Sequence, residues 1–432
     1  MHAHPTNDPA LAPGDLPAIS ARRKVGFRLI AVGLVLVIGW GIPEGIVRLA
    51  NPPLEAFRAI AFGGDPNSEK LFIKDWRLHW KLRPAVETSF LGVPVRTNQQ
   101  GMRGDDPVAG RRTVLCLGDS TTFGWRVALA DTYPAKLQAR LNDDAKSPNS
   151  WNVVNAGVPG YSSWQVRLVA EKLVPLWKPA VVVICLGNNE AWPAARSDRQ
   201  MDADRALSGR VGAALSSSRA LVWAAEKLRP EKPQPFIAPT LDKAVPRVSR
   251  DEFAENLRQI VRVARAANAR VVLVSPPVNL YFAPQRFEQF SGWEKWKAFF
   301  GEVTELSQAG RSQQLLAKVN AALEANPESF CALWIKGLAI SDRDPAGGRE
   351  LLEQAIEQHP FPENCKRSYR RVIAEVANTE NTGFLDVNEL FLRRASGPIP
   401  AALYLDWCHP TPQGHAFMAE ALADALAGGE RH

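Results

Sequence analysis

Short apolar runs alternate with amphipathic stretches over much of the chain. The apolar runs predict strands at 113–117, 152–155, 180–186, 269–274 and 383–387. The amphipathic stretches predict helices at 133–141, 163–173 and 251–267. Because short continuous apolar runs suit strands that are buried on both faces, this alternation predicts an α/β fold with a doubly wound parallel sheet. Ligands of such sheets bind where the loops after the strands converge, at the carboxyl edge.

Two regions interrupt the alternation. Residues 195–250 hold a helical stretch rich in Ala, Ser and Arg, which runs into the Pro-rich segment 230–246. This region is either a lid or membrane-proximal cap or, by preference, an ordinary surface excursion. Residues 302–366 turn helical, and Leu323–Pro327 is echoed by Ile356–Pro360 at an offset of 33. That period predicts a tetratricopeptide-like insert, which leans on the main domain because so few repeats cannot bury a core alone.

The N-terminus carries one long apolar run, Leu29–Pro43, preceded by Arg22, Arg23, Lys24 and Arg28. It predicts a transmembrane signal-anchor over 25–45, after a cytoplasmic tail over 1–24. The basic flank places the rest of the chain on the extracytoplasmic, periplasmic side of the inner (cytoplasmic) membrane as a single-pass protein. A cleaved signal peptide is the main alternative, but no small-x-small cleavage site follows the run.

Composition narrows the class of protein. The 432 residues are 46% hydrophobic and 22% charged, which excludes a disordered chain and a polytopic membrane protein. The net charge is +7, but no zinc-finger or RNA-binding signature accompanies it, so nucleic acid is not an expected partner. The five cysteines form no CxxC pair; Cys116 and Cys185 are expected to be buried thiols. Whether Cys331 and Cys365 pair stays open.

Ser120 is the candidate nucleophile. It lies in the turn Gly118-Asp119-Ser120, directly after the first strand and ahead of a helix. That position presents its hydroxyl at the carboxyl edge of the sheet. Such a tripeptide alone is as often a turn or a helix cap, so the interpretation needs a base and a site for the oxyanion.

The candidate base lies near the other end of the chain, in the segment Asp406–His415. His409 follows Asp406 by three positions, a spacing that lets the carboxylate orient the imidazole while the second ring nitrogen faces Ser120. Thr411 and Pro412 are expected to cap and begin the following helix. His415 is interpreted as a histidine bonded to the backbone.

Candidate oxyanion donors follow the next two strands. Asn155–Ser163 contains Gly160, and Gly187–Glu190 contains Asn189. A glycine lets its backbone amide approach an oxyanion closely, and an asparagine supplies a side-chain donor. With the Ser120 amide these would make three donors, although either block alone is also ordinary turn chemistry.

Taken together, the four blocks resemble the SGNH hydrolases, also called GDSL esterases and lipases. In this resemblance Ser120 falls on the nucleophile, Gly160 and Asn189 on the oxyanion donors, and Asp406 and His409 on the terminal Asp-x-x-His block. Glu190 stands where the family often has aspartate, and Cys408 has no assigned role. The segment Asn98–Gly104 looks like the prelude of membrane-anchored bacterial members.

The resemblance implies a flavodoxin-like three-layer α/β/α fold and ester chemistry with no metal or other cofactor. The sequence over 46–112 is interpreted as a connector with short extended pieces. The hydrolase domain is expected over 113–301 and 367–432, interrupted by the insert at 302–366. The expected substrate is an ester-bearing glycan or lipid, with a protein partner at the insert as a further expectation. An O-acyltransferase that modifies a cell-surface polysaccharide with the same triad, or a binding protein with a residual triad, remains the alternative.

Overall fold

The computed structural model forms two compact units, residues 1–57 with 210–232 and residues 58–209 with 233–432. The residues that the structure describes are 28, 31, 34, 35, 37–50, 65–75, 77–143, 150–201, 218–228, 244–283, 293–395 and 401–427.

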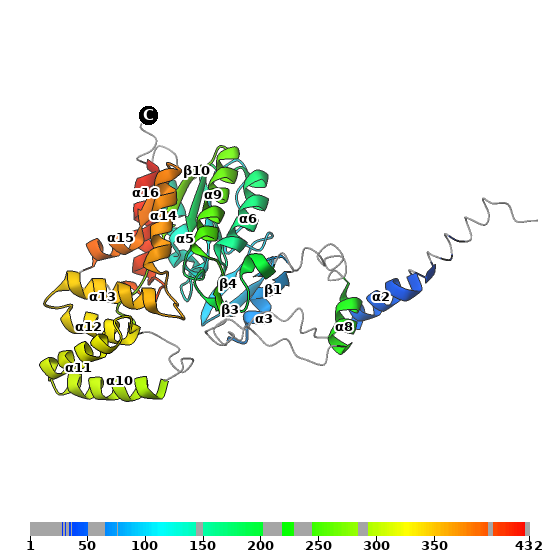
Figure 1. The fold of residues 1–432 in the computed structure, drawn as a ribbon. Helices are drawn as coiled ribbons and strands as arrows, with labels where there is room; N and C mark the ends of the chain where they lie inside the picture. The colour runs from blue at the N-terminus through cyan, green and yellow to red at the C-terminus, as the bar shows by residue number, and fades with distance from the viewer. Residues whose placement is uncertain are drawn as a thin grey trace, which may run out of the picture. The chain divides into compact units, whose positions relative to one another are not determined.

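A five-stranded parallel sheet forms the centre of the larger unit (Figure 1). Its order is β11-β10-β7-β5-β6. If the five strands are numbered along the chain and read from the β6 edge, the order is 2-1-3-4-5, the flavodoxin-like arrangement. All five predicted strands are present and differ from the prediction by at most two residues at an end. Their bounds are β5 (Arg112–Gly118), β6 (Trp151–Gly157), β7 (Val181–Cys185), β10 (Arg270–Ser275) and β11 (Gly383–Asp386).

Helices cover both faces of this sheet. Alternate side chains of β5 enter different cores: Leu115 and Leu117 pack with one set of helices, Val114 and Cys116 with the other. The resulting α/β/α layering matches the predicted fold class. The helices on the first face are α6 (Ser163–Trp177), α9 (Arg250–Ala266) and α14 (Arg367–Thr379), and those on the second are α5 (Tyr133–Asn142), α15 (Val387–Arg394) and α16 (Pro412–Ala427).

The segment before β5 is more than the predicted connector over 46–112. Leu71, Phe72, Trp80 and Phe90 are buried in the same core as α6 and α9. The short strands fit the extended pieces predicted here. Their burial in the core was not predicted, because four residues show too little alternation to indicate a buried face. The elements here are α3 (Ser68–Leu71) and the antiparallel pairs β1 (Phe72–Asp75) with β2 (His79–Leu82) and β3 (Glu87–Phe90) with β4 (Val93–Arg96).

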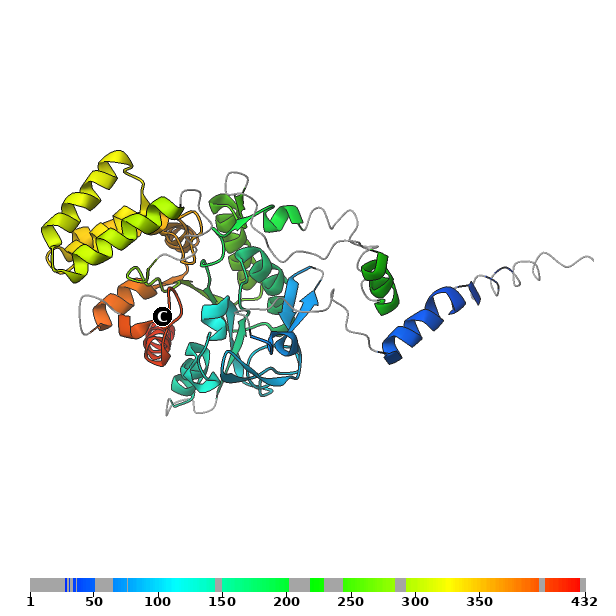
Figure 2. The same cartoon turned by 90° about the horizontal axis from the view of Figure 1, so that it is seen from below.

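Four helices form the insert predicted over 302–366 (Figure 2). The predicted start at 302 falls inside the first of them, because this helix already begins at Trp293. Val319 and Ala332 belong to a small core of the insert's own, whereas Ile356 joins the core of the sheet. The insert therefore leans on the main domain, while its likeness to tetratricopeptide repeats stays a prediction. Its helices are α10 (Trp293–Gln308), α11 (Ser312–Ala325), α12 (Phe330–Ile340) and α13 (Pro345–Gln358).

The smaller unit contains a π-helical turn, η1 (Val37–Gly41), followed by α2 (Ile42–Ala50), and it contains α8 (Arg219–Leu228). The Glu44 carboxylate of α2 accepts hydrogen bonds from the Ala220 N–H (2.9 Å) and the Ser218 hydroxyl (2.6 Å) at the start of α8. Among the described residues, no helix combines the length and the apolar character needed to cross a bilayer. Much of the segment predicted over 25–45 lies outside those residues.

Short elements complete the larger unit. β8 and β9 pair antiparallel at the two ends of the excursion predicted over 195–250. All five cysteines are buried free thiols, so Cys331 and Cys365 are not paired. The short elements are α4 (Ser120–Phe123), η4 (Leu129–Asp131), β8 (Pro193–Ala194), β9 (Val245–Pro246) and η7 (Ala401–Leu403).

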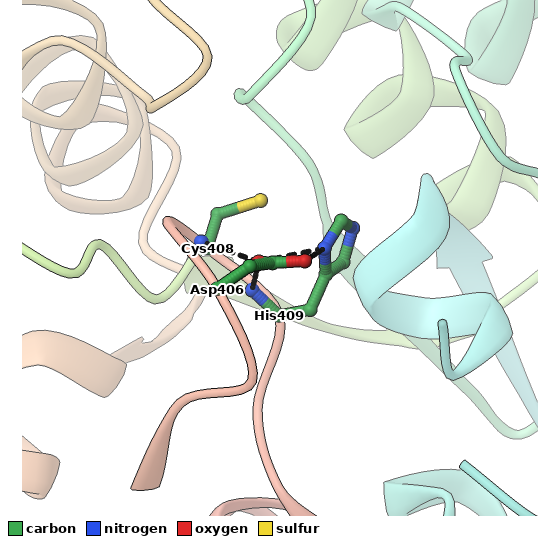
Figure 3. A group of neighbouring side chains, drawn as sticks. All are labelled: Asp406, Cys408 and His409. Carbon is green, nitrogen blue, oxygen red and sulfur yellow. Dashed lines mark hydrogen bonds and ion pairs between the residues drawn. The ribbon is translucent and has the colours of Figure 1, made fainter. Parts of the chain in front are cut away.

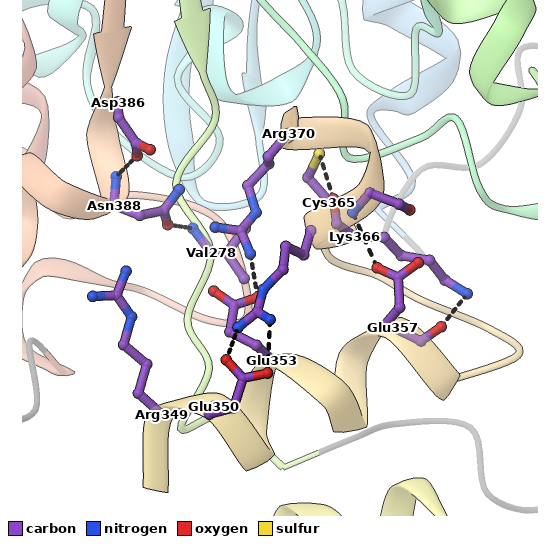
Figure 4. Close-up of polar contacts among 12 residues, drawn as sticks. Val278, Arg349, Glu350, Glu353, Glu357, Cys365, Lys366, Arg370, Asp386 and Asn388 are labelled. Atoms are coloured by element: carbon purple, nitrogen blue, oxygen red, sulfur yellow. Dashed lines mark hydrogen bonds and ion pairs between the residues drawn. The ribbon is translucent and has the colours of Figure 1, made fainter. Parts of the chain in front are cut away.

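A buried ion pair joins the insert to the sheet domain. Glu353 of α13 bonds Arg370 of α14, and their side chains are only 4% and 10% exposed (Figure 4). On the exposed side of the same helices, Glu350 pairs with Arg367 at 2.7 Å. The two pairs differ mainly in burial, and burial decides how much the loss of one partner lowers the free energy of unfolding.

We expect Glu353→Gln to lower the free energy of unfolding by about 3–5 kcal/mol, because it leaves the Arg370 guanidinium buried without its counter-charge. The control Glu350→Gln breaks an exposed pair and should cost less than about 1 kcal/mol. Urea denaturation of the purified protein measures both. Equal small losses would show that the buried pair does not hold the insert in place.

Candidate active site

Ser120 is the first residue of α4, at the carboxyl end of β5. Asp119 caps this helix, accepting the Thr121 N–H at 2.9 Å. Gly118 permits the tight approach, since a Cβ here would lie 2.1 Å from the Cys185 carbonyl oxygen of β7. The turn thus holds the serine at the edge where the loops after the strands converge.

His409 and Asp406 lie in the loop before α16, and His409 reaches Ser120. The His409 Nε2 is 2.8 Å from the Ser120 Oγ. On the other side of the ring, Nδ1 is 2.7 Å from Asp406 Oδ2 and 2.9 Å from Oδ1 (Figure 3). All three residues are at most 8% exposed. The structure therefore brings together the three residues predicted as nucleophile, base and orienting acid.

The Asp406 carboxylate is held in its charged form. Burial opposes ionisation, but hydrogen bonds from His409 and from the Cys408 N–H outweigh it and keep the pKa of Asp406 below its usual range. A carboxylate at Nδ1 favours the tautomer with its proton there. That leaves Nε2 as the acceptor for the serine proton. The indole of Trp125 stacks on the imidazole, with ring centroids 5.3 Å apart, and limits its rotation.

The predicted oxyanion donors lie on the two adjacent loops. Gly160 has φ 78°, a conformation that glycine adopts without strain. In the described part of the chain, the N–H groups of Ser120 and Gly160 donate to no acceptor. The Asn189 side chain donates one hydrogen to the Tyr161 carbonyl at 3.0 Å, which leaves its second amide hydrogen available.

Direct hydrogen bonds tie these loops together. The Val158 N–H donates to the Gly118 carbonyl at 3.1 Å, and the Ser163 N–H donates to the Glu190 carboxyl at 2.7 Å. The loops after β5, β6 and β7 are thus held against one another. The role of the three donors stays a prediction from sequence.

Arg103 is a supporting residue that the sequence did not single out, although it lies in the segment Asn98–Gly104. Its buried guanidinium donates to the carbonyls of Phe123 (2.7 Å), Gly124 (2.6 Å) and Val127 (2.7 Å). These include the carbonyls at the end of α4, which have no partner in the helix itself. Arg103 therefore fixes the short helix that begins with Ser120.

His415 is bonded to the backbone, as predicted. Its Nδ1 accepts the Tyr133 N–H at 3.2 Å, and burial lowers the pKa of the imidazole to about 3. Thr411 and Pro412 also take their predicted places: α16 begins at Pro412, and the Thr411 hydroxyl accepts the Gly414 N–H. The imidazole of His415 is thus neutral, buried and already bonded to the backbone. The histidine that faces Ser120 is His409.

Cys408 lies beside the triad with its thiol buried (Figure 3). Among the described residues, ligand atoms of Asp406, Cys408 and His409 lie within 4.8 Å of one another, a spacing that suits a metal ion. The chemistry of the donors does not suit one well. Burial raises the pKa of Cys408 well above its usual range, and both Asp406 oxygens already bond His409. We assign no metal to this group.

A small cavity of about 30 Å³, largely lined by aromatic and apolar side chains, lies beside Trp407, a neighbour of the triad. Trp407 lines it and sits 6.2 Å, centroid to centroid, from the His409 ring. The insert also lines this cavity, with Trp334 of α12 and Phe361 of the loop after α13. The insert thus builds part of the surface around the candidate active site.

Comparison with known families gives one match. Residues 116–325 match the model of the GDSL-like Lipase/Acylhydrolase family. This segment includes Ser120, Gly160 and Asn189, whereas Asp406 and His409 lie beyond it. No curated protein matches the chain.

Several solved structures are similar at low identity. TesA is 17% identical, with a TM-score of 0.35, and the match covers 73% of this chain and 99% of that one. The acetylxylan esterase Axe2 from Geobacillus stearothermophilus is 19% identical, with a TM-score of 0.37 and coverage of 73% and 94%. LAE5, an alpha/beta hydrolase from the metagenome of Lake Arreo, Spain, is 16% identical, with a TM-score of 0.38 and coverage of 74% and 97%. At these TM-scores, none supports an inference about this chain.

The family match supports an ester-cleaving hydrolase. More particularly, the segment that resembles the GDSL-like acylhydrolases begins in β5 and contains β6, β7 and β10 of the parallel sheet. The region beyond the matched segment contains α13 of the insert and the Asp406–His409 loop.

Glu190 is a buried carboxyl directly after Asn189. One oxygen accepts the Ser163 N–H, and the other has no hydrogen-bond partner among the described residues. Burial raises the pKa of Glu190 from 4.5 to about 8. At neutral pH the folded protein therefore holds a proton that the unfolded chain has released.

This shift predicts that the contribution of Glu190 to stability is full below pH 4.5 and is lost as the pH rises to about 8. Over that window the free energy of unfolding should fall by up to about 1.4 kcal/mol per pH unit. Glu190→Gln removes the titration, so the difference from wild type should grow with pH. Chemical denaturation from pH 5 to 8 measures it, with the exposed Glu255→Gln as a control. A pH-independent difference for Glu190→Gln would contradict the assignment.

Proposed function

We propose that the protein is a serine hydrolase that cleaves carboxylic esters through Ser120, His409 and Asp406. The observation that carries the proposal is the 2.8 Å contact between Ser120 Oγ and His409 Nε2, with Asp406 at the opposite ring nitrogen. A nucleophile, a base and a group that orients the base are the parts that acyl transfer through a serine requires.

In the proposed reaction, Ser120 Oγ attacks the ester carbonyl while its proton passes to His409 Nε2. The negative charge that develops on the carbonyl oxygen is stabilised by the amides of Ser120 and Gly160 and by the Asn189 side chain. When the tetrahedral intermediate collapses, the C–O bond to the alcohol breaks and His409 returns the proton to the alcohol. Water then attacks the acyl-enzyme with His409 as base, which releases the acid and restores Ser120.

The proposed substrate is an acyl or acetyl ester on an extracytoplasmic glycan or lipid. The aromatic rings of Trp125 and Trp407 beside His409 support a site that presents aromatic surface to the substrate. The apolar run Leu29–Pro43 with its basic flank supports an anchor in the inner membrane, with the hydrolase domain outside the cytoplasm. A protein partner at the insert is part of the same proposal.

Transfer to a second alcohol is the alternative reaction of the same triad. The acyl-enzyme would pass its acyl group to a sugar hydroxyl, with His409 taking the proton of that hydroxyl. Such transfer needs the same nucleophile, base and orienting acid as hydrolysis, and these are the three residues brought together here.

We expect Ser120→Ala and His409→Ala to abolish the turnover of p-nitrophenyl acetate by the purified, detergent-solubilised chain. Asp406→Asn should reduce kcat by about 10⁴-fold, because the imidazole loses its orienting charge. Cys408→Ser, which changes a buried neighbour outside the triad, should retain turnover and serves as the control. Unchanged turnover by folded Ser120→Ala would disprove the proposal.

Adding an oligosaccharide acceptor separates the two reactions. A hydrolase should release free acetate at a rate independent of the acceptor, whereas a transferase should acetylate the sugar faster than it releases acetate. Mass spectrometry of the oligosaccharide measures transfer, and Ser120→Ala controls for non-enzymatic acylation. If acetylated sugar forms faster than free acetate, the reaction is acyl transfer and the hydrolase proposal is wrong.

A further inference from the structure

Three consecutive carbonyls of the loop after β6 are each held by a different side chain. The Trp80 indole N–H donates to the Pro159 carbonyl at 3.0 Å. Arg247 donates to the Gly160 carbonyl at 2.7 Å, and Asn189 donates to the Tyr161 carbonyl at 3.0 Å. The three donors come from β2, from the residue after β9 and from the loop after β7, so elements far apart in sequence converge on one turn.

We infer that Trp80 and Arg247 are positioning residues for the oxyanion site, because they fix the peptide planes on either side of Gly160. The inference rests on the proposed function, which assigns the Gly160 amide to the oxyanion. It extends the machinery beyond Ser120, Gly160 and Asn189 to two residues outside the four sequence blocks.

Trp80 acts on the amide through the planarity of the peptide bond. The Pro159 carbonyl and the Gly160 N–H belong to one trans peptide unit and point in opposite directions. The indole N–H holds the carbonyl on one side, and this hydrogen bond directs the Gly160 N–H to the other side. A glycine at positive φ has few steric restraints on rotation of this unit, so an external restraint matters more here than at most residues.

Trp80 is itself held by the loop that it restrains. Its side chain is buried, with 3% exposure, and its backbone carbonyl accepts the Tyr161 hydroxyl at 2.6 Å. The rings of Trp80 and Tyr161 also pack, 5.8 Å apart and tilted. Because the indole cannot rotate freely in this environment, its N–H is a fixed donor.

Arg247 restrains the next peptide unit through an equally fixed guanidinium. It forms an ion pair with Asp198 at 2.9 Å, with side-chain exposures of only 6% and 0%. Gln165 accepts another of its N–H groups at 2.8 Å, and the Ser162 hydroxyl donates to Asp198 at 2.5 Å. The guanidinium is therefore held by Asp198, in the excursion over 195–250, and by Gln165 of α6.

The test compares Trp80→Phe with Trp177→Phe. The first removes the indole N–H while keeping an aromatic ring, and the second makes the same change at the far end of α6. With p-nitrophenyl acetate, Trp80→Phe should lower kcat by about 10- to 100-fold, below the loss of about 10²–10³ for deleting an oxyanion donor. KM should stay within about twofold, and Trp177→Phe should behave as wild type.

A boronic acid inhibitor provides the readout that a purely structural role would not move. Its adduct with the Ser120 Oγ is tetrahedral and negatively charged, so it uses the oxyanion donors in the way the transition state does. We expect its Ki to rise by the same factor by which Trp80→Phe lowers kcat/KM. An unchanged Ki with a lowered kcat would overturn the positioning role.

Arg247 supplies an independent test should Trp80→Phe fail to fold. Arg247→Met should lower kcat in the same way, and Arg247→Lys should restore part of it by keeping one donor and the charge opposite Asp198. Folding of each variant is checked by thermal unfolding. The inference would be overturned if folded Arg247→Met keeps wild-type kcat and Trp80→Phe either keeps wild-type kcat or fails to fold.

Fluorophosphonate labelling distinguishes a failure of the proposed function from a failure of this inference alone. Wild-type protein should be labelled at Ser120, which supports the proposed function before any positioning variant is tested. Absence of labelling in folded wild type would overturn the proposed function and this inference together. Labelling of wild type with unaltered kinetics in the positioning variants would overturn only the inference.

Discussion

The hydrogen bond between His409 Nε2 and Ser120 Oγ joins residues that are 289 positions apart. It forms only when β5 lies between β7 and β6 in the sheet and α16 packs on one face of the sheet, which brings the Asp406–His409 loop to Ser120. The parallel sheet makes this meeting possible, because every strand delivers its following loop to the same edge. The reactive arrangement thus depends on the completed sheet, and on its last helix as much as on its first strand.

Buried polar groups fix the positions of these loops, and burying such groups also costs free energy of folding. Arg103, Arg247 and Glu190 are polar groups inside the protein, where an unsatisfied donor or acceptor destabilises the fold. Two of them are satisfied chiefly by backbone carbonyls or by a counter-charge: Arg103 at the end of α4, and Arg247 at Gly160 and Asp198. Glu190 avoids a buried negative charge by retaining a proton, because burial raises its pKa to about 8. The polar groups that hold the catalytic loops are therefore also groups on which stability depends.

The sequence predicted the sheet well because continuous apolar runs such as 113–117 have few alternative structures. The order of the blocks containing Ser120, Asn189 and His409 also located the candidate site, since each follows a predicted strand or precedes a predicted helix. What sequence could not identify depends on tertiary contacts. Trp80 and Arg247 have no local pattern that marks them as hydrogen-bond donors to a distant loop. The short extended pieces before β5 were predicted, but their burial in the core was not, because four-residue strands carry little periodicity.

The central claim is that Ser120 is an activated nucleophile that forms an acyl-enzyme. The most direct measurement is to mix the protein with p-nitrophenyl acetate, quench in acid within the first turnovers, and map the modified residue by peptide mass spectrometry. The account predicts one acetyl group on Ser120, with none on this peptide in His409→Ala. Acetylation at another residue, or turnover with no acyl group on Ser120 at any quench time, would contradict it.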